Sequence, residues 1–325
     1  MEDDQDLLVQ VAKLYYVSNL TQAEIGRKVG TSRSTVSRLL QEAREKGIVQ
    51  ITINYPWERD STLESALKKR FGLLDARVLR GFGRQMTDIR VGMGRLAAEC
   101  IDGVVADDII LGVSYGRSIA NTIEQLSPTR KVKMTVVQII GALGSGNPLI
   151  EGPDLARELA NKYGAQYRYL YAPLVVEDQR TRDLLLQEPY VHETLSMGKQ
   201  ADAVIIGIGA LEANTSSLIW TGYLNQKEIA WLRNKGAVGH MCAKLFDAYG
   251  EPLDVDLNRR TIAIEIESLR RIKTVIAIAG GREKAKAILG ALRGRYLNIL
   301  VTDDGAAEEL LLLAEQEKDA ESAWT

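Results

Sequence analysis

Four loops rich in small residues each follow a stretch of apolar residues that is typical of a buried strand. They are GVSYGRS at 112–118, GALGSGNP at 141–148, GIGA at 207–210 and AGGREK at 279–284. Because glycine has no side chain, the backbone N–H groups around it can approach an anion closely. A helix that begins directly after such a loop also points the positive end of its dipole at the anion. The four loops therefore indicate a site for an anionic small molecule.

Several side chains in these loops could complete an anion site. Ser114 and Ser118 offer hydroxyl donors, and Arg117 adds a fixed positive charge. Lys284 lies one turn into the helix expected after the last loop, close enough to pair with a phosphate or carboxylate. Glycine also simply ends strands, so one such loop alone would be weak evidence. Four of them at one edge of a sheet favour a ligand site over a purely structural role.

Asp247, in the sequence KLFDAYGE, is the carboxylate of most interest. It follows a short apolar run and precedes an expected turn, so it could accept hydrogen bonds from ligand hydroxyl groups. The alternative is that Asp247 merely starts the turn, and the sequence leaves both roles open. Asp303 and Asp304 follow a strand, and we expect them to cap the last helix rather than to act as paired acids.

Metal and redox chemistry find little support in the sequence. The two histidines, His192 and His240, have no Cys, Asp or Glu at the spacing of a metal site. The two cysteines, Cys100 and Cys242, lie in apolar contexts and are expected to be reduced thiols of the core. We therefore expect no metal ion, no cofactor and no catalytic residue.

Residues 20–47 have the pattern of two short helices joined by a tight turn. Ile25 and Val29 are apolar residues one turn apart, and Gly30 is the type of residue that ends a helix with a positive φ. Thr31 or Ser32 can cap the next helix by accepting a hydrogen bond from a backbone N–H group. The second helix has one apolar face, formed by Val36, Leu39, Leu40 and Ala43.

The opposite face of this second helix carries short hydroxyl side chains beside arginines. Arginine can bind guanine O6 and N7 with two hydrogen bonds, and serine can reach phosphates or base edges. The spacing matches a helix-turn-helix motif, in which the second helix reads the DNA. The residues expected to contact operator DNA are Gln22, Ser32, Arg33, Ser34, Ser37 and Arg38.

The distribution of charge favours DNA binding over a plain helical hairpin with a solvated polar face. Residues 21–50 hold six basic and three acidic residues, a local net charge of +3, whereas the whole chain carries −2. A basic island in a mildly acidic protein is the electrostatic footprint of a nucleic acid partner. Because one helix-turn-helix makes few base contacts, we expect at least a dimer on a two-fold related DNA site.

The length of 325 residues suggests two domains. We expect a winged helix-turn-helix domain at 1–56, with a wing strand in 48–56, a linker helix at 57–72, and an effector-binding and oligomerisation domain at 73–325. The linker helix would pack on the next domain or pair with a second copy. The acidic N-terminus lacks a signal region, and no apolar run approaches the roughly 20 residues that span a bilayer. We therefore expect a cytoplasmic protein with no membrane partner.

The alternation of strands and helices from Ala76 onward predicts an α/β domain with a mostly parallel sheet. Near-continuous apolar segments such as DIILGV and AVIIGI are typical of strands that are buried on both faces. The carboxyl ends of such strands share one edge, where ligand crevices form. The expected strands are 76–79, 108–113, 132–140, 167–171, 203–208, 274–279 and 297–301.

Both halves of the chain resemble the SorC family of bacterial sugar-responsive transcriptional regulators. The segment LTQAEIGRKVGTSRSTVSRLLQEAREKGIVQITI is similar to that family's DNA-binding signature. The effector-domain blocks of the family match, in order, GVSYGRS, AVIIGIGA, TGYL, KGAVGH with LFDAYGE, and AIAGGREKAKAILGAL followed by NILVTDDGAA. Tyr115 stands where the family often has Trp, and Ser118 where Thr is common, but both substitutions keep the chemistry of the loop.

The resemblance implies an effector domain related to sugar-phosphate isomerases. It also extends the expected homo-oligomer from a dimer to a tetramer. It also implies that the protein is released from DNA, or rearranges on it, when a phosphorylated sugar or a polyol binds. By motif, the effector-binding residues would be Ser114, Tyr115, Gly116, Arg117, Ser118, Gly141, Gly207, Gly209, Asp247, Gly281 and Lys284.

The competing interpretation is an enzyme, a sugar-phosphate isomerase or deaminase that carries a DNA-binding arm. Such chemistry needs a carboxylate base and a partner acid poised over C1 and C2 of the sugar. The loops at the strand ends offer Ser, Gly and Arg instead, and no carboxylate directly follows 108–113 or 203–210. We therefore expect a transcriptional regulator whose operator binding is controlled by a small sugar-phosphate or polyol-type effector and which controls genes of carbohydrate catabolism, and not an enzyme.

Overall fold

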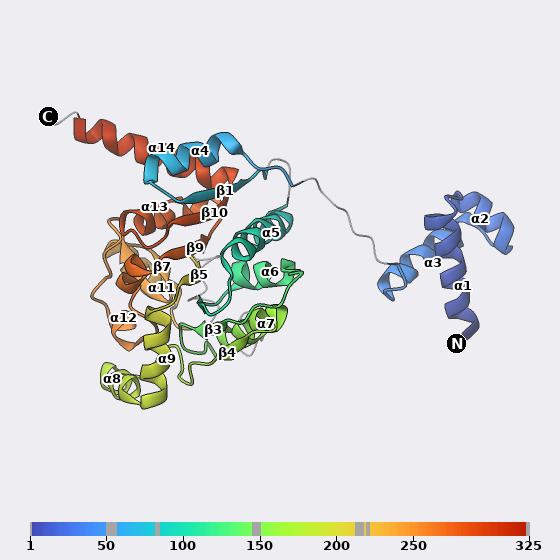
Figure 1. Ribbon diagram of the computed structural model, residues 1–325. Helices are drawn as coiled ribbons and strands as arrows, with labels where there is room; N and C mark the ends of the chain where they lie inside the picture. Colours follow the sequence, from blue (N-terminus) through green and yellow to red (C-terminus); the bar gives the residue numbers. More distant parts are fainter. Residues whose placement is uncertain are drawn as a thin grey trace. The chain divides into compact units, whose positions relative to one another are not determined.

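The computed structural model of this protein describes residues 2–49, 57–81, 85–144, 151–211, 218 and 222–322. The chain divides into two compact units, Met1–Pro56 and Trp57–Thr325 (Figure 1). They are called the N-terminal unit and the C-terminal unit below, and each is described by itself.

Short helices build the N-terminal unit. They are α1 (Glu2–Ala12), continued by a π-helix η1 (Lys13–Val17), then α2 (Gln22–Val29) and α3 (Arg33–Glu45). Each helix contributes an apolar stripe, and Val11, Ile25, Val36 and Leu40 are at most 1% exposed where the stripes meet. Burying one such side chain stabilises the unit by about 1.5–3 kcal/mol, so these few contacts hold the helices together.

Local interactions fix the turn between α2 and α3. Gly30 adopts a φ of 73° and ends α2 in the left-handed conformation, as the sequence predicts. The Ser32 hydroxyl accepts a hydrogen bond of 3.1 Å from the Thr35 N–H group, so Ser32 is the cap of α3. Gly26 lies against this turn, because a Cβ atom on it would be 2.8 Å from the Thr31 carbonyl oxygen. The two helices can therefore approach closely only because position 26 has no side chain.

The wing strand that the sequence predicts at 48–56 lies largely outside the described residues. Ile48 and Val49, which the structure does describe, form a bend after α3. The Val49 N–H group donates a hydrogen bond of 3.0 Å to the Ala43 carbonyl, which turns the chain back on the helix end.

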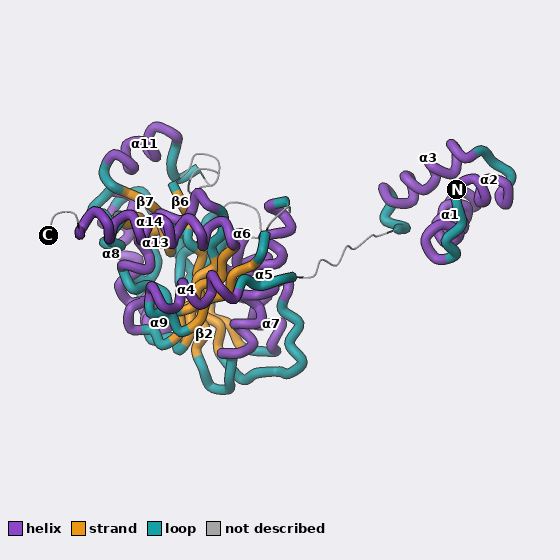
Figure 2. The backbone as a smooth tube through the Cα atoms, turned by 90° about the horizontal axis from the view of Figure 1, so that it is seen from above, coloured by secondary structure: helices purple, strands orange, loops and turns teal. Residues whose placement is uncertain are grey.

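A seven-stranded parallel sheet forms the centre of the C-terminal unit (Figure 2). Its strands are β1 (Asp75–Leu79), β2 (Ile110–Val113), β3 (Thr135–Gln138), β4 (Gln166–Arg168), β5 (Ala203–Gly207), β9 (Thr274–Ile278) and β10 (Ile299–Asp303). Their order in the sheet is β1-β10-β9-β5-β2-β3-β4. The mostly parallel α/β fold is thus confirmed, although β3 and β4 are shorter than predicted. The chain builds outward from β2 to β4 and then, in the opposite direction, from β5 to β10.

Helices cover both faces of the sheet, each face with its own hydrophobic cluster. One face carries α5 (Met86–Val104), α6 (Arg117–Gln125) and α7 (Gly152–Tyr163). The other carries α4 (Ser61–Phe71), α9 (Pro189–Lys199) and α14 (Asp304–Ser322). Beside them, α8 (Gln179–Gln187) contacts α9, α13 (Ala285–Arg293) contacts α14, and α11 (Gln226–Asn234) joins the same hydrophobic cluster. The short helices are α12 (Asp256–Arg260), η2 (Ile266–Arg271) and η3 (Arg282–Lys284). Among the helices described, none is both long and apolar enough to cross a membrane.

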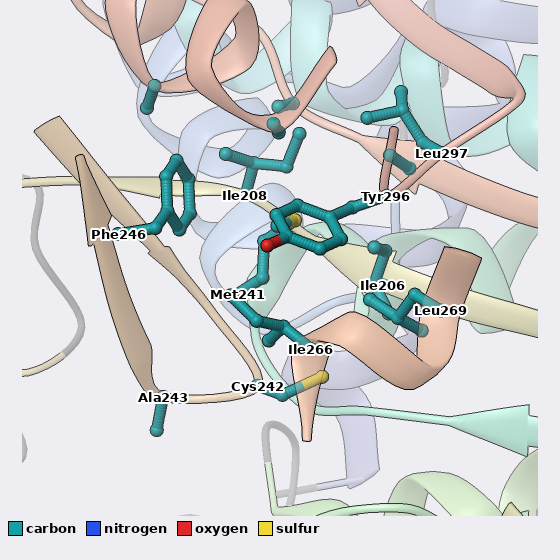
Figure 3. Packing of buried hydrophobic residues seen from close by; sticks show 14 of the residues in the cluster. Ile206, Ile208, Met241, Cys242, Ala243, Phe246, Ile266, Leu269, Tyr296 and Leu297 are labelled. Carbon is teal, nitrogen blue, oxygen red and sulfur yellow. The ribbon is translucent and has the colours of Figure 1, made fainter. Parts of the chain in front are cut away.

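The sequence pattern does not predict the second, smaller sheet, in which β6 (Gly209–Ala210), β7 (Ala237–Met241) and β8 (Lys244–Asp247) pair antiparallel. Cys242 and Ala243, with φ of 48° and 59°, make the tight turn between β7 and β8. Residues other than glycine rarely adopt this conformation, and surrounding structure must impose it. Met241 and Phe246 share one buried cluster with Tyr296, which anchors the hairpin to the main core (Figure 3).

The predicted linker helix, α4, packs on the C-terminal unit of its own chain, where it contacts β1 and α14. Glu64 of α4 is buried, and its carboxylate receives hydrogen bonds of 2.7 and 2.8 Å from Arg59. The same carboxylate accepts a 3.0 Å hydrogen bond from the Val78 N–H group in β1. Because this carboxylate joins helix and strand, α4 is a fixed part of the C-terminal unit.

Candidate effector cavity and DNA-facing helix

A cavity of about 150 Å³ opens at the carboxyl ends of β2, β5 and β9. The strand order reverses between β2 and β5, and ligands of open α/β sheets bind at such a point. Eight residues that the sequence analysis singles out line this cavity: Ser114, Tyr115, Gly116, Arg117, Ser118, Gly207, Gly209 and Lys284. The other lining residues are Met86, Arg90, Met93, Ile208, His240, Cys242, Gly280 and Glu283.

The loop after β2 forms one wall of the cavity. Ser114 is buried, and its N–H group donates a 3.1 Å hydrogen bond to the Ile205 carbonyl, which ties the loop to β5. Gly116 adopts a φ of 113° and precedes α6, which begins at Arg117 without a side chain to cap it. The first N–H groups of α6 are therefore directed toward the cavity mouth without a capping side chain, an arrangement that suits an anion.

Positive charge gathers on the other walls. Arg90 comes from α5, Arg117 from α6 and Lys284 from η3, whereas Glu283 is the only acidic side chain among the described lining residues. The Lys284 ammonium group has no hydrogen bond or ion pair within the part of the chain that the structure describes. Burial lowers the pKa of Lys284, and the nearby Arg90 and Arg117 lower it further, against the opposing effect of Glu283 and Asp303. A bound anion would relieve this repulsion.

Asp303 holds the loop that carries Lys284. One oxygen of its buried carboxylate accepts a hydrogen bond of 2.6 Å from the Gly281 N–H group, and the other accepts 2.8 Å from Ala306 in α14. Burial raises the pKa of this carboxyl group above its usual value. Asp303 therefore caps the last helix, as the sequence predicts, and also positions the cationic side of the cavity.

His240 is the functional candidate that sequence reasoning misses. It lies on β7, is only 5% exposed and lines the cavity, and its Nε2 atom has no hydrogen-bond partner among the described residues. Burial lowers its pKa to about 4, and Lys284 lowers it too, so the ring is neutral at pH 7. Gly209 pairs with His240 across the small sheet, and a Cβ on Gly209 would lie 2.1 Å from Nε2. No pattern of residues around His240 in the sequence predicts that its side chain lines the cavity.

Two expected glycines do not line the cavity. A Cβ atom on Gly141 would be 2.3 Å from the Pro173 carbonyl oxygen, so this glycine allows two backbone segments to meet. Its loop follows β3, one strand away from the point where the strand order reverses. Gly281 has a φ of 99° and gives its N–H group to Asp303, so it shapes the loop behind the cavity wall.

Asp247 also lies outside the cavity lining, contrary to the expectation from its motif. It ends β8 opposite Ala237, at the open end of the hairpin, whereas Cys242 at the closed end lines the cavity. Its carboxylate accepts hydrogen bonds of 2.9 Å from the N–H groups of Tyr249 and Glu251. Of the two roles that the sequence leaves open, the structure shows the starter of a turn.

In the N-terminal unit, α3 presents one polar face to solvent. Arg33, Ser34, Ser37 and Arg38 are exposed, opposite the buried apolar face of the same helix. Ser32 is exposed as well, but its hydroxyl is engaged in the cap and in contacts of 2.8 and 2.9 Å with the hydroxyls of Ser34 and Thr35. Gln22 is half-buried at the first position of α2. The structure thus leaves the two arginines accessible to a DNA groove.

Two sequence families match this chain in separate regions. The family of a sugar-binding domain matches residues 55–312, and that of sigma-70 region 4 matches residues 9–46, which include α2 and α3. The deoxyribonucleoside regulator of Bacillus subtilis (strain 168) is 33% identical over 309 residues, which cover 95% of this chain and 98% of that protein. This chain belongs to the SorC family of bacterial sugar-responsive transcriptional regulators.

Other members of the SorC family support the same assignment. The sorbitol operon regulator of Klebsiella pneumoniae is 32% identical over 320 residues, covering 95% of this chain and 98% of that one. The crystal structure of full-length SorC from Klebsiella pneumoniae matches with a TM-score of 0.71 and 31% identity, over 97% of this chain and 100% of that chain. This SorC-family protein is therefore a DNA-binding transcriptional regulator controlled by a sugar effector, and not an enzyme.

Proposed function

We propose that the effector of this regulator is a small phosphorylated sugar or a polyol-type analogue, and that it binds in the cavity at the ends of β2, β5 and β9. The observation that carries the proposal is the unpartnered ammonium group of Lys284 in a pocket that also holds Arg90 and Arg117. A phosphate group supplies several strong acceptors and negative charge, so it can bind these cations and the N–H groups at the start of α6.

The operator is bound by α3, in this proposal. Arg33, Ser34, Ser37 and Arg38 enter the major groove, and Ser32 and Gln22 lie at the helix starts, where backbone N–H groups meet phosphates. The protein acts in the cytoplasm as a homo-oligomer, a dimer or tetramer, because a single reading helix contacts too few bases for useful specificity.

Effector binding and operator binding are coupled because each shifts the balance between two conformational states of the protein. A ligand shifts the balance only through its different affinity for the state that binds DNA well and the state that binds it poorly. Coupling is reciprocal, so an effector that weakens operator binding tenfold is itself bound tenfold more weakly by the DNA complex.

The test is a crossed pair of variants in the full-length protein, with an operator obtained by selection from random DNA. Arg38→Ala should weaken operator binding by about 1–3 kcal/mol and leave effector binding unchanged. Lys284→Ala should bind the operator normally and lose roughly 10- to 100-fold in affinity for a phosphorylated effector, because a charged hydrogen bond in the cavity is lost. Fluorescence anisotropy measures the first affinity and calorimetry the second.

Two variants serve as controls for the change of charge. Lys286→Ala removes an exposed lysine two residues after Lys284, and Arg95→Ala removes an exposed arginine from α5. Both should behave like the wild type in each assay. A full ligand response in Lys284→Ala would place the effector site elsewhere, and unchanged DNA affinity in Arg38→Ala would exclude this face of α3.

A further inference from the structure

The cavity holds two polar groups that the protein itself leaves unsatisfied, and they differ in chemistry. One is the ammonium group of the half-buried Lys284, a donor of hydrogen bonds. The other is Nε2 of His240, which is fully buried and has no hydrogen-bond partner among the described residues. A buried polar atom without a partner costs about 1–3 kcal/mol, so its presence in a folded protein calls for an explanation. His240 is only 5% exposed and lines the cavity, so a bound ligand can provide the missing hydrogen bond.

The surrounding charges decide which kind of hydrogen bond this atom makes. Lys284 acts electrostatically on His240, and Arg90 and Arg117 line the same cavity, against the single carboxylate of Glu283. A ring nitrogen that carries a lone pair is favoured beside cations, whereas an N–H group with its partial positive charge is disfavoured. In the neutral ring Nε2 is therefore the acceptor and Nδ1 carries the proton.

We propose that Nε2 of His240 accepts a hydrogen bond from a hydroxyl group of the bound effector, at a subsite separate from the anion site at Lys284. This inference rests on the proposed function, because it assumes that the effector occupies this cavity. It adds a requirement: besides its anionic group, the ligand must carry a hydroxyl group within reach of β7. His240 is thus a specificity-determining residue that distinguishes a polyhydroxylated effector from a simple phosphate.

Gly209 provides a second way to test this assignment. The imidazole ring occupies the space where a side chain on the opposite strand would lie, because a Cβ at position 209 would be 2.1 Å from Nε2. A methyl group there must displace the ring. Gly209→Ala therefore disturbs the position of His240 while the imidazole group remains in the protein.

The experiment measures calorimetric affinities of the full-length protein for ribose 5-phosphate, 2-deoxyribose 5-phosphate, sorbitol 6-phosphate and inorganic phosphate. For the sugar or polyol phosphate that the wild type binds best, His240→Ala should lose roughly 10- to 100-fold in affinity, as one unsatisfied polar group costs about 1–3 kcal/mol. Its affinity for inorganic phosphate should stay within twofold. His240→Gln, which places an amide oxygen near the position of Nε2, should recover part of the loss, and the exposed His192→Ala is the matched control.

The possible outcomes separate this inference from the proposed function. An equal loss for inorganic phosphate, or an unchanged affinity for every ligand in His240→Ala, would overturn the hydroxyl subsite. If His240→Ala does not fold, Gly209→Ala gives the same test, with the same selective loss expected. If the wild type binds none of the phosphorylated compounds, the proposal of a phosphorylated effector is wrong. If Lys284→Ala binds them as tightly as the wild type, the proposed effector site itself is wrong.

Discussion

The turn between α2 and α3 in the N-terminal unit is formed by residues close together in the sequence, whereas the effector cavity is formed by residues far apart in the sequence. In the turn, Gly26, Gly30 and Ser32 contact residues no more than seven positions away. In the cavity, Ser114, Gly207 and Lys284 line one space because three parallel strands end at one edge of the sheet. A local contact leaves its pattern in a short stretch of sequence, whereas a distant one depends on the whole topology. Gly26 in the turn and Gly141 in the loop after β3 each allow two backbone segments to approach closely, one pair near in sequence and the other distant, so they allow this comparison to be tested.

The largest effect is expected from Gly141→Ala, where a methyl group would lie 2.3 Å from the backbone oxygen of Pro173. Two backbone segments distant in sequence would have to separate, which should destabilise the C-terminal unit by about 3 kcal/mol. Gly26→Ala places its methyl group 2.8 Å from the Thr31 oxygen, within a turn that can adjust locally, and should cost about 1–2 kcal/mol. Urea denaturation measures the first variant, and hydrogen exchange of the α2 and α3 amides measures the second.

Gly103→Ala is the matched control for both variants. No atom lies within 4 Å of a Cβ at this position in α5, and alanine favours helices over glycine. This variant should be as stable as the wild type or up to about 1 kcal/mol more stable. If Gly141→Ala were as stable as Gly103→Ala, the close approach would not be the reason for glycine at 141, and a role in the effector site would regain support.

The main sheet could be predicted from sequence because its strands are continuous apolar runs separated by clear helical patterns. The small sheet could not, since the turn between β7 and β8 is Cys242–Ala243 and lacks the Asn-Gly or Gly-rich signal of such turns. Packing against the main core imposes this turn on unfavourable residues. The same holds for the effector site. The loop at Ser114 was predictable from its glycines, but the role of His240 was not, because its neighbours Gly209 and Lys284 are distant from it in the sequence.

The buried His240 should make the stability of the C-terminal unit depend on pH. The pKa of His240 is about 4 in the folded protein and about 6.5 without its surroundings, because burial disfavours the charged ring. Between these values the unfolded chain binds a proton that the folded protein does not, so stability falls as pH drops from about 6.5 to about 4. Above pH 6.5 the contribution is fully present. The difference corresponds to roughly 3 kcal/mol at most.

His240→Gln should therefore flatten the loss of stability between pH 7 and pH 4 by up to about 3 kcal/mol relative to the wild type. The measurement is the free energy of unfolding of the C-terminal unit by urea at several pH values. His192→Asn removes an exposed histidine as the control and should keep the wild-type slope. An identical slope in His240→Gln would show that position 240 is not buried as a neutral ring.

The smallest effect is expected at Ser32, in the turn between α2 and α3. Its side chain combines a structural role with a proposed role in DNA binding. Its hydroxyl caps α3 through the Thr35 N–H group, so Ser32→Ala should destabilise the N-terminal unit by about 1 kcal/mol. Ser32→Asn keeps a capping oxygen and should restore the stability measured by hydrogen exchange. Operator affinity then separates the two roles. If Ser32 acts through the cap alone, Ser32→Asn should bind DNA like the wild type; if its hydroxyl also contacts the operator, stability should return while affinity stays low.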